Sequence, residues 1–375
     1  MSEPSDGLEI LGLIATQYAS ETHAAQGPVI DKTYTAALAL AHENGGFDRV
    51  LIGYNSASPD GFQVAAYAAA RTTRLRFLLA HRPGFVAPTL AARQLATLDQ
   101  FSDGRLAVHI ITGGSDAEQQ RDGDFLSKDD RYARTDEYIS LLVKTWTEVA
   151  PFHHEGEFYE VRDSFAAVRC AQQPHIPVFF GGSSDAAIEV AGKHAHVYAL
   201  FGETLDGVAE TLGKVRAAAA RHGREGQIQF SLSLRPILGR TEQDAWDRAA
   251  RILEEARALK ERGAPSFFRR AKNESTGSQR LLAVANGGPV RDKRLWTEIA
   301  QLTGAQGNST SLVGTPEQVV EALLDYYDLG VTKFLFRGFD PLEDAIDYGR
   351  NLLPLLRARV AARRSRAASA VARVS

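Results

Sequence analysis

The sequence predicts a closed (β/α)8 barrel, and three observations lead to this fold class. Short β-branched or aromatic segments alternate with amphipathic helical segments along the 375 residues, and repeated strand–helix units imply parallel strands with helical crossovers. Eight such units favour a closed barrel, and the chain length suits a barrel with insertions. The alternative is an open doubly wound sheet, which is weakened because no G-x-G-x-x-G motif follows the first strand.

The elements are predicted in order from their patterns. The strands are expected at residues 8–15, 49–52, 75–80, 106–111, 177–180, 197–201, 228–234 and 333–337. Helices are expected at residues 33–44, from 60, and at 88–101, 134–148, 185–193, 204–221 and 242–262, with a last helix to 356. Pro88 opens the third helix in its first turn, where the missing N–H has no intrahelical partner to lose.

Two long polar segments, 113–131 and 264–308, interrupt the alternation. A long loop inside a compact domain is usually a functional lid or a disordered segment. We therefore expect one barrel domain over residues 1–356, in which 264–308 is a mobile lid insertion. Residues 357–375 form an Ala/Arg-rich tail, expected to fray as a helix or coil.

Composition excludes several classes of protein. The net charge of −3 gives no basic footprint for nucleic acid. No apolar run of about 18 residues predicts a membrane helix, and the acidic start of the sequence lacks the apolar core of a signal peptide. Cys170 is the single cysteine, so a reducing compartment is compatible and we expect a cytoplasmic enzyme. His153-His154-Glu155 lacks metal-site spacing, and we expect no metal.

Candidate site residues follow the strands, because a barrel carries its chemistry at the carboxyl ends of its strands. Gly181-Gly182-Ser183-Ser184 precedes a predicted helix, which suits a phosphate; the alternative is that Ser184 only caps that helix. Thr112-Gly113-Gly114 is a weaker version of the same chemistry. Arg82, Arg235 and Arg337 each end or follow a strand, so they form either an anion pocket or separate structural ion pairs.

Several segments together resemble the flavin-dependent alkanesulfonate monooxygenases of the luciferase-like family. The similarity covers residues 8–356, and the block from Arg82 to Tyr132 is its most specific part. The matching runs are Arg82-Pro83, residues 87–99, residues 102–105, Thr112 to Asp116, Asp122 to Leu126, Arg131-Tyr132, Phe180 to Asp185, Ser275-x-Gly277-x-Gln279-Arg280 and Ser311 to Gly314.

The resemblance implies a barrel that uses FMN in its reduced form, FMNH2, delivered by a separate NAD(P)H-dependent flavin reductase. Dioxygen is the co-substrate, and a sulfonate C–S bond is broken to give an aldehyde and sulfite. It implies a homo-oligomer, either a dimer or a tetramer, and a lid at residues 264–308 that excludes water. Carried over by position, the flavin site is Ala80, His109, Thr112, Lys128 (where the family usually has His), Tyr132, Gly182, Ser183 and Ser184.

The substrate side departs from the family. Gln17 stands for a His, Ser58 for a Cys, Phe201 for a Trp and Phe339 for a Tyr, while Ser233-Leu234-Arg235 replaces an Arg-x-His. We expect Arg235 and Arg337 to bind an anionic group, lid residues such as Arg270 or Arg280 to close over it, and Ser58 and Gln17 to hydrogen-bond near the reacting atoms. Arg82, Phe201, Ser233 and Phe339 complete this predicted substrate region.

Three alternatives remain open at this stage. The enzyme could oxygenate a neutral or carboxylated molecule, with structural arginines. It could be a deazaflavin-dependent oxidoreductase, which the sulfonate-type blocks disfavour. It could also bind flavin without turnover.

Overall fold

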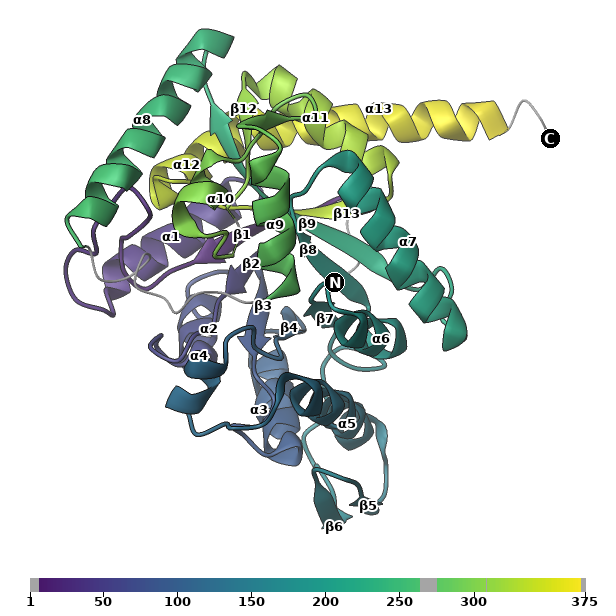
Figure 1. The fold of residues 1–375 in the computed structure, drawn as a ribbon. Coiled ribbons are helices and arrows are strands. Elements are labelled where there is room, and N and C mark those ends of the chain that lie inside the picture. Colours follow the sequence, from purple (N-terminus) through teal and green to yellow (C-terminus); the bar gives the residue numbers. More distant parts are fainter. Residues whose placement is uncertain (1–6, 264–274, 308, 372–375) are drawn as a thin grey trace.

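The computed structural model describes residues 7–263, 275–307 and 309–371 and forms a closed barrel of eight parallel strands (Figure 1). The barrel order is β13-β1-β2-β3-β4-β7-β8-β9, and β9 closes it by pairing with both β8 and β13. This confirms the (β/α)8 prediction, and all eight predicted strands are present. Their bounds are β1 Glu9–Ile14, β2 Arg49–Ile52, β3 Arg76–His81, β4 Leu106–Ile110, β7 Val178–Gly181, β8 Val197–Phe201, β9 Gln229–Leu238 and β13 Val331–Phe336.

Helices cover the outside of the barrel and connect its strands. They are α1 Lys32–Asn44, α2 Gly61–Ala69, α3 Pro88–Phe101, α4 Asp116–Arg121, α5 Lys128–Thr147, α6 Asp185–His194, α7 Leu205–Arg221, α8 Glu242–Glu261 and α11 Pro316–Asp328. The chain ends in α12 Pro341–Asp347, a π-helical turn η1 Tyr348–Leu352, and α13 Leu353–Val371. The tail thus continues α13 as helix to Val371, and in Figure 1 it projects from the body.

Two packed layers hold the barrel. The main core lies between the strands and the surrounding helices. Inside the barrel, one layer is built from side chains of alternate strand positions, as barrel geometry requires. That layer comprises Leu11, Leu78, Ala107, Phe179, Val197 and Leu335.

A buried charge cluster lies at the amino-terminal end of the strands. The Glu9 carboxylate is 2.8 Å from Arg49 Nε, 3.0 Å from Arg76 Nη2 and 2.6 Å from Lys333 Nζ. Burial alone would raise the pKa of Glu9, but these three cations outweigh it and hold that pKa well below its usual range. The cluster therefore holds together the starts of β2 and β3 and the adjacent strand pair β1–β13.

The described part of the insertion, residues 275–307, is built from α9 Thr276–Asn286, β10 Val290–Arg291, β11 Leu295–Trp296 and α10 Glu298–Thr303. It leads into β12 Ser311–Gly314, which pairs parallel to β9 from Arg235 to Leu238, beyond the barrel. The sequence prediction missed both β12 and α11. A signal for α11 was present, since Thr315 and Gln318 form a capping box around Pro316.

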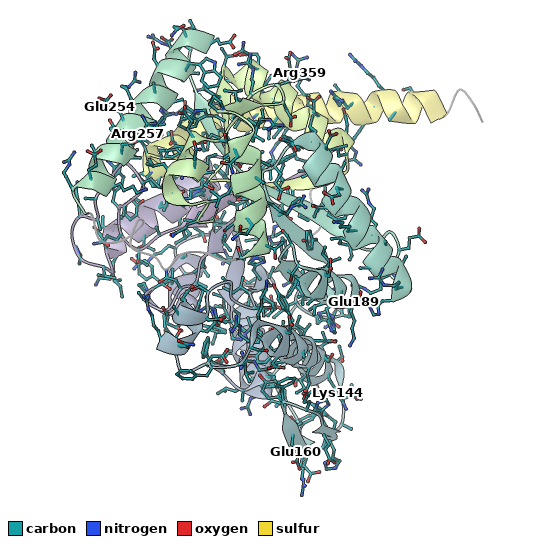
Figure 2. The ribbon with its side chains drawn as sticks, viewed as in Figure 1. Lys144, Glu160, Glu189, Glu254, Arg257 and Arg359 are labelled. Atoms are coloured by element: carbon teal, nitrogen blue, oxygen red, sulfur yellow. The ribbon has the colours of Figure 1, made fainter. Side chains whose placement is uncertain are left out.

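The segment after α5 also differs from expectation. It forms a hairpin of β5 Phe152–Glu155 and β6 Glu160–Ser164, where the sequence predicted no strand. Figure 2 shows Glu160 near its projecting tip. Helix α5 begins at Lys128 rather than at residue 134, because Ser127 caps it by accepting from Asp130 N–H. Among the described residues, no helix is both long and apolar enough to cross a membrane.

Candidate active site

A cavity of about 390 Å³ opens at the carboxyl ends of the strands, within the size range of small-molecule sites. Helix α9 of the insertion covers one side of it, and Figure 1 shows this helix in front of β8 and β9. Arg82 and Lys128 are the cations of the wall, and no Asp or Glu is among the described residues that line it. The polar lining residues are Tyr54, Arg82, His109, Thr112, Lys128, Tyr132, Ser183, Ser184, Ser231, Ser233, Ser275 and Thr276.

The turn after β7 forms one end of the cavity. Gly182 has φ +137°, and a Cβ there would lie 2.8 Å from the Ala187 Cβ and 3.2 Å from the Tyr132 hydroxyl. The Tyr198 hydroxyl of β8 donates to the Gly182 carbonyl at 2.5 Å, and this hydrogen bond holds the turn in place. Ser184 caps α6 by accepting from Ala187 N–H at 3.3 Å. The cap therefore exists, and the same turn also faces the cavity with the amino end of α6 behind it.

The amino end of α5 meets this turn. Lys128 and Tyr132 are four residues apart, so they lie on one face of α5, and both line the cavity. Burial raises the pKa of Tyr132, a shift partly offset by a hydrogen bond with Ser184. Lys128 makes no ion pair with a carboxylate of the described residues. Its charge is therefore available to an anion at the Gly182–Ser184 turn.

The middle of the wall is neutral. His109 on β4 lines the cavity, whereas its register partner Ala80 on β3 is buried and is not among the lining residues. Desolvation lowers the pKa of His109 to about 4, so its imidazole is uncharged at neutral pH, and its Nδ1 has no protein partner. The Thr112 hydroxyl donates to that of Thr135 at 3.2 Å. These groups suit the edge of a ring system better than a phosphate.

Arg82 is buried at the end of β3, with 4% of its surface exposed. Its Nη2 donates to the Glu118 carboxylate at 3.1 Å, and its Cζ lies 4.6 Å from the centre of the Tyr54 ring. Its Nε and Nη1 have no protein partner. Arg82 is thus the member of the predicted arginine pocket that the structure places in the cavity wall.

The other two arginines do not join it, and the predicted three-arginine pocket is not formed. Arg235 is fully buried, 2.9 Å from Glu21, and its Cζ lies 3.5 Å from the centre of the Phe339 ring. Arg337 donates to the same Glu21 carboxylate at 3.2 Å. Burial would raise the pKa of Glu21, yet the two guanidinium groups lower it to about 2. Neither arginine lines the cavity, since both are ion-paired with Glu21 from the β1–α1 connection. Phe339, which contacts Arg235, does not line the cavity either.

Ser58 and Gln17 also lie outside the cavity lining. The Ser58 hydroxyl donates to the Asn55 carbonyl at 2.8 Å and accepts from Asn55 N–H, so it serves a turn after β2. The Gln17 amide donates to the Gly27 carbonyl at 2.8 Å. Phe201 and Ser233, in contrast, line the cavity as predicted for the substrate region.

Arg280 anchors the insertion and does not reach into the cavity. It donates from Nε at 3.0 Å and from Nη2 at 2.8 Å to Glu203, which follows β8, and so ties α9 to the barrel. Ser278 of the same helix is fully buried and donates to the Ala305 carbonyl. Arg270 lies outside the described residues.

Sequence reasoning missed several groups at this site. Tyr54 and Glu118 both contact Arg82, and neither was among the predicted site residues. Ser275 and Thr276, at the start of α9, line the cavity. Their signal was available in the Ser-x-Gly-x-Gln-Arg run, but that run was used only to recognise the family. No cluster of metal-ligating side chains occurs in the part of the chain that the structure describes.

Comparisons with known proteins agree with this architecture. The family model for luciferase-like monooxygenases matches residues 8–333. A riboflavin lyase solved with modified FMN and riboflavin has a similar fold, with 20% identity, TM-score 0.78, and coverage of 94% of this chain and 92% of that one. An EDTA monooxygenase from Chelativorans sp. BNC1 follows at 19% identity, TM-score 0.74 and 94% coverage of both chains.

A long-chain alkane monooxygenase is likewise similar, at 19% identity and TM-score 0.75, with 96% of this chain and 92% of that chain covered. Likeness at this level of identity concerns the fold, whereas the family match extends over most of the chain. The protein is a member of the luciferase-like monooxygenase family and an oxidoreductase.

Proposed function

We propose that the protein is the oxygenase of a two-component system that uses FMNH2 and O2 to cleave the C–S bond of an organosulfonate. One observation carries the proposal: the cavity wall combines a glycine–serine phosphate turn with two cations and no carboxylate among its described residues. Such a wall favours anionic ligands throughout. A separate NAD(P)H-dependent flavin reductase would supply FMNH2.

The residues present fit FMN. Gly182 leaves its turn open where any side chain would collide with Ala187, and backbone N–H groups at a helix start favour a phosphate. Lys128, Tyr132, Ser183 and Ser184 would hold that phosphate. His109, with an unpartnered Nδ1, and Thr112 would border the ring.

The chain's own groups have three tasks in this reaction. Bound FMNH2 supplies two electrons and activates O2. Leu51, Leu78 and Leu335 form an apolar base that keeps water away from the reacting atoms. His109 stays neutral, so it can donate or accept a hydrogen bond without adding charge. The start of α9, at Ser275 and Thr276, closes the side facing solvent.

The overall reaction balances. A primary sulfonate, FMNH2 and O2 give an aldehyde, sulfite, FMN, water and one proton. One oxygen atom of O2 enters the aldehyde and the other leaves as water.

A second candidate is a luciferase-like oxygenase acting on a neutral or carboxylated molecule. The observation that favours it is the pairing of Arg235 and Arg337 with Glu21, which removes two of the three arginines expected to bind a sulfonate. A deazaflavin enzyme is a further possibility, since an F420-dependent secondary alcohol dehydrogenase shares the fold at 14% identity and TM-score 0.68. Flavin binding without turnover is the remaining alternative.

The test is sulfite release from a panel of sulfonates, with a flavin reductase, NAD(P)H, FMN and air. We expect sulfite from at least one compound, dependent on both FMN and this protein. Sulfite from none, with binding of FMNH2 retained, would contradict the sulfonate assignment and move the substrate to the second candidate. Loss of binding to FMNH2 itself would contradict the flavin assignment.

A further inference from the structure

Arg82 differs from Arg235 and Arg337 in the carboxylate that accompanies it. Arg235 and Arg337 share Glu21, which is buried beside the buried Arg235 and the half-buried Arg337 and lies outside the cavity lining. Arg82 lines the cavity, and its carboxylate partner Glu118 does not. The described residues that line the cavity therefore include Arg82 but no carboxylate.

The burial of Arg82 lacks full compensation from the protein. A guanidinium group carries five N–H donors, yet only Nη2 donates to a carboxylate, while Nε and Nη1 are buried without a partner. Buried donors without acceptors are destabilising, and more so when charged. A ligand in the cavity that accepts hydrogen bonds from Nε and Nη1 would remove this cost.

Two neighbours hold Arg82 in place. The Tyr54 ring lies 4.6 Å from its Cζ, a distance at which the ring face attracts a cation. The Tyr54 hydroxyl donates to Asp122 at 3.2 Å. Glu118 accepts from Arg82 and from Ser56 N–H at 3.2 Å. The guanidinium is therefore oriented before any ligand arrives.

Arg82 is also separate from the phosphate turn. The turn follows β7, Arg82 follows β3, and β4 lies between these strands in the barrel. Lys128 lies on α5 with Tyr132, beside the turn. A flavin phosphate bound there would be matched by Lys128, so Nε and Nη1 of Arg82 would still lack an acceptor.

We propose that Arg82 binds the anionic group of the substrate, a sulfonate or carboxylate, and that Glu118 and Tyr54 are positioning residues. The inference rests on the proposed flavin site at Lys128 and the Gly182–Ser184 turn. An anionic oxygen could come from the substrate or from the reduced flavin ring; the assignment is to the substrate.

The experiment is anaerobic calorimetric titration of the complex with FMNH2. The probes are 1-octanesulfonate, octanoate and the uncharged octanesulfonamide, with methanesulfonate as a short anion. We expect the wild type to bind at least one anion about tenfold or more tightly than the sulfonamide, the effect of one charge-assisted hydrogen-bonded contact. Arg82→Ala should abolish that preference, and Arg82→Lys should restore part of it.

Matched variants separate binding from structure. Arg121→Ala removes an exposed arginine of the same helix as Glu118 and should change nothing. Glu118→Gln should weaken anion binding by a smaller factor than Arg82→Ala, without altering the affinity for FMNH2. In turnover with whichever panel compound reacts, Arg82→Ala should raise KM more than it lowers kcat.

Two results would overturn the proposal. One is an Arg82→Ala variant that loses affinity for FMNH2 in the same proportion as for the anion, which would assign Arg82 to the flavin. The other is a wild-type complex that binds no anion of the panel more tightly than the sulfonamide. Neither result decides the flavin assignment, which depends on binding of FMNH2 by the wild type.

Discussion

The two ends of the barrel both bury charge, but they compensate it differently. At the amino-terminal end, Arg49, Arg76 and Lys333 all contact Glu9, and all of them except the half-buried Arg76 are buried. At the carboxyl-terminal end, Arg82 and Lys128 face a cavity whose described lining has no carboxylate. The cluster around Glu9 is thus compensated within the chain, whereas Arg82 has one carboxylate partner and keeps two nitrogens without an acceptor in the cavity wall.

The Arg235–Glu21–Arg337 group refines this comparison. Arg235 lies in β9 just past its pairing with β13, and Arg337 follows β13, so the group is near the functional end of the barrel. It is nevertheless ion-paired internally, like the cluster around Glu9. Position at the functional end therefore does not make an arginine a ligand-binding group. Nε and Nη1 lack a partner in Arg235 as they do in Arg82. What distinguishes Arg82 is that it lines the cavity, where a ligand can supply the missing acceptors.

The largest effect is expected at the amino-terminal end. Glu9→Gln leaves three cations, two of them buried, without this counter-charge, and we expect the free energy of unfolding to fall by about 4–5 kcal/mol. Urea denaturation at pH 7.5 measures it. A decrease in the free energy of unfolding of less than about 1 kcal/mol would contradict the contrast between the two ends of the barrel, because it would mean that Glu9 does not compensate these cations.

Glu21→Gln is expected to lower the free energy of unfolding by about 3 kcal/mol at pH 7.5. The pKa of Glu21 in the fold, about 2, is below its ordinary value of 4.5, so its contribution is complete above pH 4.5 and is lost as the pH falls toward 2. The difference between variant and wild type should therefore shrink in denaturation series taken downward from pH 5. A constant difference would contradict the ion-pair explanation.

His81 tests a buried neutral group behind the cavity wall. Its Nε2 lies 2.6 Å from the Tyr138 hydroxyl, and burial lowers its pKa from 6.5 to about 4. Because the unfolded state takes up the proton more readily, stability is lost as the pH falls from 6.5 toward 4. The His81→Gln variant can keep the Tyr138 contact. Between pH 7.5 and 5, we expect its free energy of unfolding to fall by about 2 kcal/mol less than that of the wild type. Parallel pH dependences would exclude His81 as a source of the loss.

The smallest effect on stability is expected at Arg82. Arg82→Met keeps an apolar side chain against Tyr54 and removes the unpartnered donors, so the free energy of unfolding should change by less than about 1 kcal/mol, or rise. Arg235→Met, the matched variant at the paired group, should be less stable by about 3 kcal/mol. Equal losses in the two variants would remove the distinction between an arginine of the cavity wall and one buried in an internal ion-pair group.

The fold was predictable because its signal is local and repeated. Each barrel strand is a short apolar run between helical patterns, so all eight strands were located from sequence. The hairpin of β5 and β6 escaped because its segments are short and largely exposed, as with His153 and Glu160. Strand β12 escaped because four residues after a long polar segment give little periodicity.

The site was predictable only where its chemistry is contained in one segment. The Gly181–Ser184 turn and the α5 pair Lys128 and Tyr132 could be read locally or from the resemblance, and they meet at the cavity. Arg235 could not be placed in the same way, because its partner Glu21 lies far away in the sequence. Ion pairing across the barrel depends on tertiary contacts that a strand-end pattern does not encode.

The central claim, a phosphate-binding flavin site at the Gly182–Ser184 turn, is tested most directly by anaerobic titration with FMNH2 and with reduced riboflavin. Reduced riboflavin lacks the phosphate. We expect the wild type to bind FMNH2 at least about tenfold more tightly, and Lys128→Ala to lose most of that preference. Equal affinity of the wild type for both flavins would contradict the account.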